Sequence, residues 1–135
     1  MLRDGGLSKA EREMIVVATS GPNACPYWVV AHGAILRVCA KNPFIADLVA
    51  TNYRKAGLSP RQNAMLAFAL EVALRSSEID EADFAVLRGH GFDDEDIWDI
   101  GNITAFFCHS NRMANLIRLR PNDEFYLLGR VPKQK

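Results

Sequence analysis

The stretch that decides the fold is Ser8–Leu36, SKAEREMIVVATSGPNACPYWVVAHGAIL. Its first four residues have the S-x-x-E spacing of a capping box, which marks the start of a helix before an apolar run. A Gly-Pro pair ends that helix, and Pro26 suits the first turn of a second one. The stretch therefore predicts two helices joined by a short turn, over residues 9–19 and 25–40.

Helix starts and stops recur along the rest of the chain. Asn-Pro and Ser-Pro pairs open helices over 42–53 and from 60 onward, because proline is well placed at a first helical position. An aspartate opens a short helix over 80–88, and an acidic stretch opens a long helix over 93–119. No run alternates as paired strands do. The fold class is therefore all-α, with about six helices and a helical hairpin at its core.

Composition excludes several classes of function. The chain has 135 residues, and its 16 basic and 16 acidic side chains cancel, so no charge pattern indicates binding to nucleic acid or to an anionic membrane. No apolar run is long enough to span a bilayer, and the start lacks the layout of a signal peptide. Three widely spaced cysteines argue against a disulfide framework. We expect a cytoplasmic protein with free thiols.

One segment indicates self-association. The stretch Ala64–Leu74 is apolar on every side except for Glu71. A helix without a polar face is buried all round, and in a chain of this length a second subunit is a natural cover for part of it. We therefore expect a homo-oligomer.

Cys25, Trp28 and His32 are the main candidates for chemistry. They are spaced i, i+3, i+7 and share one helix face. Cys25 stands at a helix start, where unpaired N–H groups and the helix dipole favour a thiolate, which reacts with electrophiles and peroxides. From the residues alone, Cys25 can equally be a small buried hydrophobe and His32 a hydrogen-bonded core residue. Both interpretations stay open.

The pattern E-x(11)-C-P-Y-W-x-x-x-H resembles the motif E-x(11)-C-x-x-C-x-x-x-H of the alkylhydroperoxidase D-like family. It is most similar to the peroxidase-related branch, within the carboxymuconolactone decarboxylase-like superfamily. Further likeness in LSKAEREMI, DDEDIWDIG, SNRMAN and NDEFYLLGR extends over nearly the whole chain. The resemblance implies one helical domain over 1–135, without a further N-terminal helical segment that family members usually carry.

The resemblance also implies roles for particular residues. Glu13 matches the motif glutamate, Cys25 the first cysteine and His32 the histidine. In the family the second cysteine attacks the peroxide, the first resolves it as a disulfide, and the histidine and glutamate relay a proton. Trp28 stands at the position of the second cysteine and is expected to line the substrate pocket. Cys39 lies fourteen residues beyond Cys25, about 21 Å along the same helix, which is beyond disulfide reach.

The sequence is compatible with three functions. The first is a one-cysteine peroxidase, in which Cys25 attacks a hydroperoxide and an external thiol reductant resolves the product. The second is a non-catalytic oligomeric protein for binding or assembly on the same fold. The third is acid–base chemistry by His32 and Glu13, as in the decarboxylases of the superfamily. No cofactor is expected. No metal is expected either, because the spacing of these residues matches none of the usual short ligand pairs.

The remaining residues of chemical interest have simpler explanations. We expect Glu11 to be used in the capping box, which leaves Glu13 as the relay candidate. His90, between two glycines, is expected in an exposed loop. Three aromatic residues of the last helix are expected in the core: Trp98, Phe106 and Phe107. The neighbouring group His109, Asn111 and Arg112 fits helix contacts as well as a site. Cys108 can approach Cys25 only through the tertiary fold, and the tail 122–135 is expected to pack down before it frays at Lys133.

Overall fold

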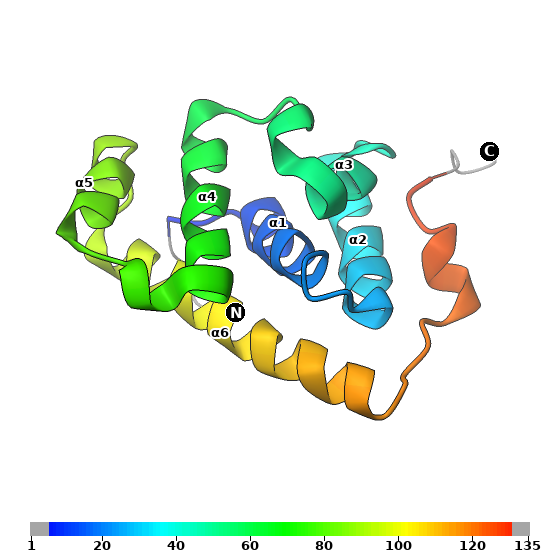
Figure 1. The fold of residues 1–135 in the computed structure, drawn as a ribbon. Helices are drawn as coiled ribbons and strands as arrows, with labels where there is room; N and C mark the ends of the chain where they lie inside the picture. The colour runs from blue at the N-terminus through cyan, green and yellow to red at the C-terminus, as the bar shows by residue number, and fades with distance from the viewer. Residues whose placement is uncertain (1–5, 131–135) are drawn as a thin grey trace.

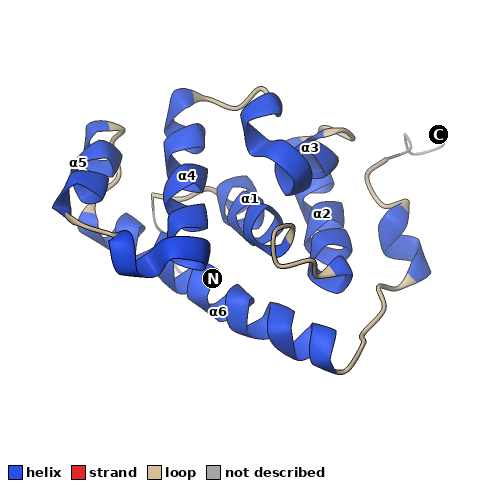
Figure 2. Cartoon of the chain, viewed as in Figure 1, coloured by secondary structure: helices blue, strands red, loops and turns tan. Residues whose placement is uncertain are grey.

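The computed structural model describes residues 6–130, and this part of the chain contains six α-helices and no strand (Figure 2). The helices are α1 (Lys9–Ser20), α2 (Pro26–Ala40), α3 (Ile45–Asn52), α4 (Pro60–Arg75), α5 (Glu81–Gly89) and α6 (Asp94–Leu116). The predicted all-α fold is therefore confirmed. No helix within residues 6–130 is both long enough and apolar enough to cross a bilayer.

Helix α1 is the centre of the fold. It packs against α2, α3, α4 and α6, which lie around it in Figure 1. Ile15, Val16 and Val17 are fully buried although they point in different directions around the helix. The hydroxyl of Thr19, also fully buried, donates to the carbonyl oxygen of Ile15 at 2.8 Å, which satisfies it without water. The motif hairpin therefore places its first helix in the core and its second against it.

The C-terminal end of α1 lies very close to α3. Gly21 caps α1, and a Cβ at this position would lie 2.1 Å from the backbone carbonyl oxygen of Ala50. The backbone of Gly21 has φ −61°, an ordinary helical value, so its conformation does not require glycine. The absence of a side chain is what allows α1 and α3 to approach.

Helix starts follow the sequence closely. Ser8, Ser59, Asp80 and Asp93 are the N-caps of α1, α4, α5 and α6, and each closes a reciprocal capping box with the third residue of its helix. The predicted role of Glu11 in the first of these boxes is confirmed.

Two predicted boundaries are wrong by a few residues. Helix α3 begins at Ile45 rather than at 42, because the side-chain oxygen of Asn42 accepts from the backbone N–H of Phe44 and forms a turn before the helix. Helix α6 ends at Leu116 rather than at 119. Arg118 adopts a left-handed conformation with φ 57°, and the N–H of the next residue bonds back to the carbonyl of Ala114, as in a Schellman motif.

Helix α4 is not buried all round in the single chain. Met65, Leu66 and Ala69 have no exposure, whereas Ala67 is exposed and half of Leu74 faces solvent (51 %). The exposed part of α4 is the part for which the sequence predicts cover by a second subunit, and that cover stays a prediction. The apolar residues of α4 lie all round the helix, but only one side of it packs against α1 and α6.

The closing segment packs against α2 through an arginine. Arg37 is buried, and its guanidinium donates to the carbonyl oxygens of Phe125 and Leu128, both at 2.8 Å. This burial lowers the pKa of the Arg37 guanidinium. Arg130 adds a bidentate ion pair with Asp47 of α3. The segment thus packs down as expected, but charged hydrogen bonds hold it while Leu128 stays half exposed. The fraying expected at the end of the tail lies outside the described residues.

Candidate active site at the α1–α2 hairpin

Glu13 and His32 meet across the hairpin. Glu13 projects from α1 and His32 from α2, and the imidazole Nδ1 lies 2.5 Å from the carboxylate Oε2. Both side chains are largely buried, with exposures of 6 % for the glutamate and 13 % for the histidine. The carboxylate orients the ring through Nδ1, and Nε2 is then the nitrogen that can exchange a proton with a reactant.

Two aromatic rings enclose this imidazole. The centroid of Trp28 lies 5.2 Å from that of His32, and the centroid of Phe107 lies 4.9 Å from it. Trp28 and Phe107 also contact each other edge to face at 5.4 Å. The indole N–H of Trp28 is buried and has no hydrogen-bond partner. The position of the motif's second cysteine is therefore occupied by an indole whose ring is tilted by 46° against the imidazole of His32.

Phe107 belongs to the site as well as to the core. It is buried, as expected. Its contact with His32 was not apparent from the sequence, because α6 is distant along the chain and only the tertiary fold brings the two rings together.

Cys25 lies apart from the Glu13–His32 pair. It is the N-cap of α2, and its side chain makes no capping bond and is 1 % exposed. His32 is seven residues further along the same helix, which places it about 10 Å away along the axis. The structure thus brings Glu13, Trp28 and His32 together and places the motif thiol in the core at the start of the helix.

A chain of amide hydrogen bonds surrounds the turn before Cys25. The side-chain nitrogen of Asn23 donates to Asn111 at 2.9 Å and lies 3.5 Å from the sulfur of Cys108. The fully buried Asn111 donates in turn to the hydroxyl of Ser20 at 2.9 Å, and Asn115 donates to the carbonyl of Asn23 at 3.2 Å. Helix α6 therefore holds the α1–α2 turn, and Asn111 makes the helix contacts that were one of its two expected roles.

Other candidates lie away from the site. His90 is exposed at the end of α5, as expected, and His109 and Arg112 are exposed on α6. Trp98 and Phe106 are 73 % and 62 % exposed, so the expectation that they belong to the core is wrong. Among residues 6–130, no three His, Cys, Asp or Glu side chains cluster as metal ligands do.

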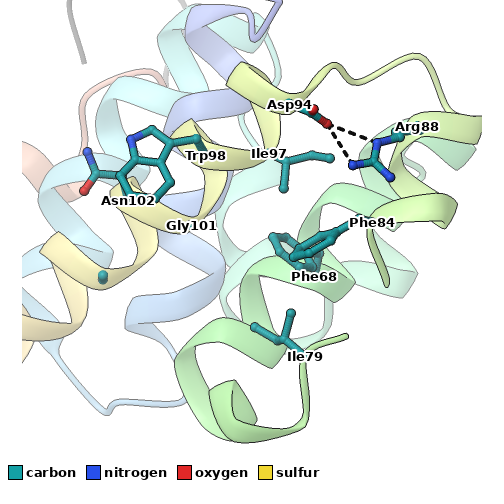
Figure 3. A pocket seen from close by; sticks show the side chains of 10 residues that line it. Phe68, Ile79, Phe84, Arg88, Asp94, Ile97, Trp98, Gly101 and Asn102 are labelled. Carbon is teal, nitrogen blue, oxygen red and sulfur yellow. Dashed lines mark hydrogen bonds and ion pairs between the residues drawn. The ribbon is translucent and has the colours of Figure 1, made fainter. Parts of the chain in front are cut away.

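A groove of about 490 Å³ lies between α4, α5 and α6, and Figure 3 shows the side chains that line it. Its walls are mainly apolar, with Phe68 and Phe84 on one side and Trp98 on the other, and the ion pair of Arg88 with Asp94 lies at its rim. None of the motif residues lines this groove. It is a surface separate from the Glu13–His32 pair.

Comparison with known proteins places these features in a family. No family model and no curated protein matches the chain. Among solved structures, an uncharacterized peroxidase-related protein from Ralstonia eutropha JMP134, described as an alkylhydroperoxidase AhpD core, is 68 % identical with a TM-score of 0.96. The match covers 98 % of this chain and 70 % of that one.

Two further solved structures are similar. An uncharacterized peroxidase-related protein from Silicibacter sp. TM1040 is 48 % identical with a TM-score of 0.94, over 96 % of this chain and 68 % of that one. A protein of unknown function from Agrobacterium tumefaciens, at 23 % identity and a TM-score of 0.76 over 87 % of this chain and 80 % of that one, shares the fold. The identities and coverages of the first two show the family: this chain belongs to the peroxidase-related proteins of the AhpD-like superfamily.

Proposed function

We propose that the chain reduces small hydroperoxides in a slow, thiol-dependent reaction at Cys25. The observation that carries this proposal is the 2.5 Å contact between Glu13 and His32, because it keeps two residues of the family motif together in a chain that also keeps the first motif cysteine. The similarity to peroxidase-related proteins supports the same chemistry. In the reaction, the Cys25 sulfur bonds to one peroxide oxygen, the O–O bond breaks, and an alcohol leaves as Cys25 becomes a sulfenic acid.

The geometry also explains why the reaction is expected to be slow. The relay histidine contacts Trp28, whereas Cys25 is about 10 Å away along the helix. A positioned acid or base contributes about 10²- to 10⁴-fold to a rate, and Cys25 lacks this direct assistance. The sulfur is also almost inaccessible, which restricts the substrate to small hydroperoxides.

We expect slow hydroperoxide consumption with a dithiol reductant that is abolished in Cys25→Ser and retained in Cys39→Ser. Cys39 is the matched control, because it lies on the same helix, is also free, and takes no part in the site. The measurement is steady-state peroxide loss for the wild type and both variants. Turnover that persists in Cys25→Ser would rule out the thiol mechanism.

A second candidate function is acid–base chemistry on a small carbonyl compound. The specific observation in its favour is that the Glu13–His32 pair is intact although an indole, rather than a thiol, stands at the second cysteine position of the motif and contacts the histidine. Activity on such a compound that is lost in His32→Ala and retained in Cys25→Ser would select this candidate.

The partner that the surface suggests is a second copy of this chain. Helix α6 has an exposed apolar face, which we call the α6 stripe: Trp98, Phe106, Met113, Leu116 and Ile117. Apolar surfaces of this extent usually mark interaction sites. The start of the helix, residues 93–99, carries five acidic residues, while residues 112–120 carry three arginines. Two antiparallel copies of the α6 stripe would place acidic ends on basic ends, as a twofold interface requires.

We expect an oligomer rather than a 15.0 kDa monomer at micromolar concentration. Phe106→Glu should shift the population toward monomer, because it places a charge in the centre of the α6 stripe. Val86→Glu is the control, since Val86 is similarly exposed but lies on α5. Size-exclusion chromatography with light scattering measures all three proteins. A monomeric wild type would contradict the expectation, and dissociation by both variants would place the interface elsewhere.

A further inference from the structure

The burial of Cys25 limits how its oxidised form can be reduced. Cys25 is 1 % exposed, so only a molecule as small as a hydroperoxide can reach its sulfur during local fluctuations of the fold. A larger thiol reductant, which must also bring its own sulfur against that of Cys25, is hindered. An external thiol was the expected resolving group from the sequence alone. The structure makes a thiol within the chain the more suitable partner.

Cys108 is placed to be that partner. In the chain, Cys25 lies between Asn23 and Trp28, and these two residues contact Cys108 and Phe107, which are consecutive on α6. Residues on both sides of the buried Cys25 in the sequence therefore contact the turn of α6 that carries the second thiol. The bonds of Asn111 and Asn115 to the preceding turn hold α6 in this position.

The surroundings of Cys108 suit a resolving thiol. Cys108 is partly exposed whereas Cys25 is buried, so a reductant has easier access to Cys108. The side-chain N–H of Asn23 points at the sulfur at 3.5 Å and stabilises the charge that develops when this sulfur leaves a disulfide. The third cysteine, Cys39, lies about 21 Å from Cys25 along α2 and is excluded.

We propose that Cys108 resolves the sulfenic acid of Cys25, in an inference that rests on the proposed oxidation of Cys25 by hydroperoxide. The sulfur of Cys108 attacks the sulfur of Cys25, an S–S bond forms, and the S–O bond breaks. The hydroxyl leaves as water with the proton of the Cys108 thiol. An external dithiol then attacks Cys108, which releases the Cys25 sulfur and forms a mixed disulfide, and the second thiol of the reductant displaces Cys108 from it. The pair Cys25–Cys108 thus replaces the disulfide between the two motif cysteines.

The test compares two oxidants on the native protein. One sample receives one equivalent of hydrogen peroxide and the other diamide, which oxidises thiol pairs without a sulfenic acid. Free thiols are then alkylated and the disulfide-linked peptides mapped by mass spectrometry. We expect a 25–108 linkage with both oxidants in the wild type and in Cys39→Ser. In Cys108→Ser, peroxide should leave Cys25 as a sulfenic acid, and dimedone added together with urea, which exposes the sulfur, should trap it in a larger amount than in the wild type.

The two oxidants separate the failure of this inference from the failure of the proposed function. Dimedone-trapped Cys25 without a 25–108 linkage under either oxidant would overturn the role of Cys108 and leave peroxide reduction standing. A linkage with diamide, combined with unreacted Cys25 under peroxide, would show the pairing but overturn the peroxidase proposal and with it the resolving role. Circular dichroism of each serine variant checks that the helical fold is retained.

Discussion

Replacing Trp28 with cysteine is expected to raise dithiol-dependent hydroperoxide consumption by about 10²-fold or more, since a positioned acid or base contributes at least that factor. The new sulfur would lie one turn after Cys25 and one turn before His32 on the same helix face. His32, held by Glu13 at 2.5 Å, would then lie next to the attacking thiol. The measurement is steady-state peroxide loss with a dithiol reductant, compared with the wild type.

Controls separate the effect of the sulfur from that of the space it opens. Trp28→Ala opens the same volume without a thiol and should stay slow. Adding His32→Ala or Glu13→Gln to Trp28→Cys should remove most of the gain, because each breaks the relay. A Trp28→Cys protein that folds but gains no activity would contradict the assignment of the relay and favour a binding or assembly function.

The same substitution also affects stability. Removing the half-buried indole leaves a cavity, which typically costs a few kcal/mol (about 3–5 for a fully buried tryptophan). Part of that cost is offset, because the indole N–H is buried without a partner and its loss removes an unsatisfied donor, a gain of about 1–3 kcal/mol. Activity assays are therefore best run well below the unfolding temperature of the variant.

Gly21→Ala is expected to destabilise the fold by about 3 kcal/mol, the upper end of typical overpacking costs. The added methyl would meet the carbonyl oxygen of Ala50 at 2.1 Å, and that atom belongs to a helix backbone that cannot simply turn away. The two helices must then separate at the end of α1, the most buried element of the fold. Urea or thermal unfolding measures the loss.

Gly101→Ala is the matched control. Gly101 lies inside α6, and a Cβ there meets nothing within 4 Å. Alanine should therefore raise the free energy of unfolding by about 0.5–1 kcal/mol through the lower entropy of the unfolded chain. If Gly21→Ala and Gly101→Ala changed the free energy of unfolding by the same amount and in the same direction, the close contact of α1 with α3 would not be what requires glycine at position 21.

The helices were predictable because their signals are local. Ser8, Ser59, Asp80 and Asp93 each carry the capping information within four residues, and all four starts are confirmed. The end of α6 was missed because an arginine, rather than glycine, takes the left-handed position. The central place of the hairpin that contains α1 was also predictable, whereas the exposed side of α4 depends on how the helices pack. The apolar α4 is open on one side, while α1, with its charged start, is enclosed by four neighbours.

The site was predictable only where one motif spans it. The resemblance of the motif to that of the AhpD-like family implied that Glu13 and His32 act together, and the structure places them in contact. The neighbours from α6 were not predictable in the same way, because Phe107 and Cys108 reach the hairpin only through the packing of distant segments. Hydrophobicity alone also misplaced Trp98 and Phe106, since an apolar side chain on a helix can face a partner as well as a core.

Both the proposed peroxidase reaction and the role of Cys108 require that a hydroperoxide oxidises the sulfur of Cys25. The most direct test is the rate of oxidation of Cys25 relative to Cys39 in the same molecule, measured by quenched mass spectrometry with one equivalent of hydrogen peroxide. Cys39 is the more exposed of the two, so exposure alone would make it react first. We predict faster oxidation of Cys25 in the folded protein and similar rates for both cysteines in urea. Faster oxidation of Cys39 in the folded protein would contradict this prediction.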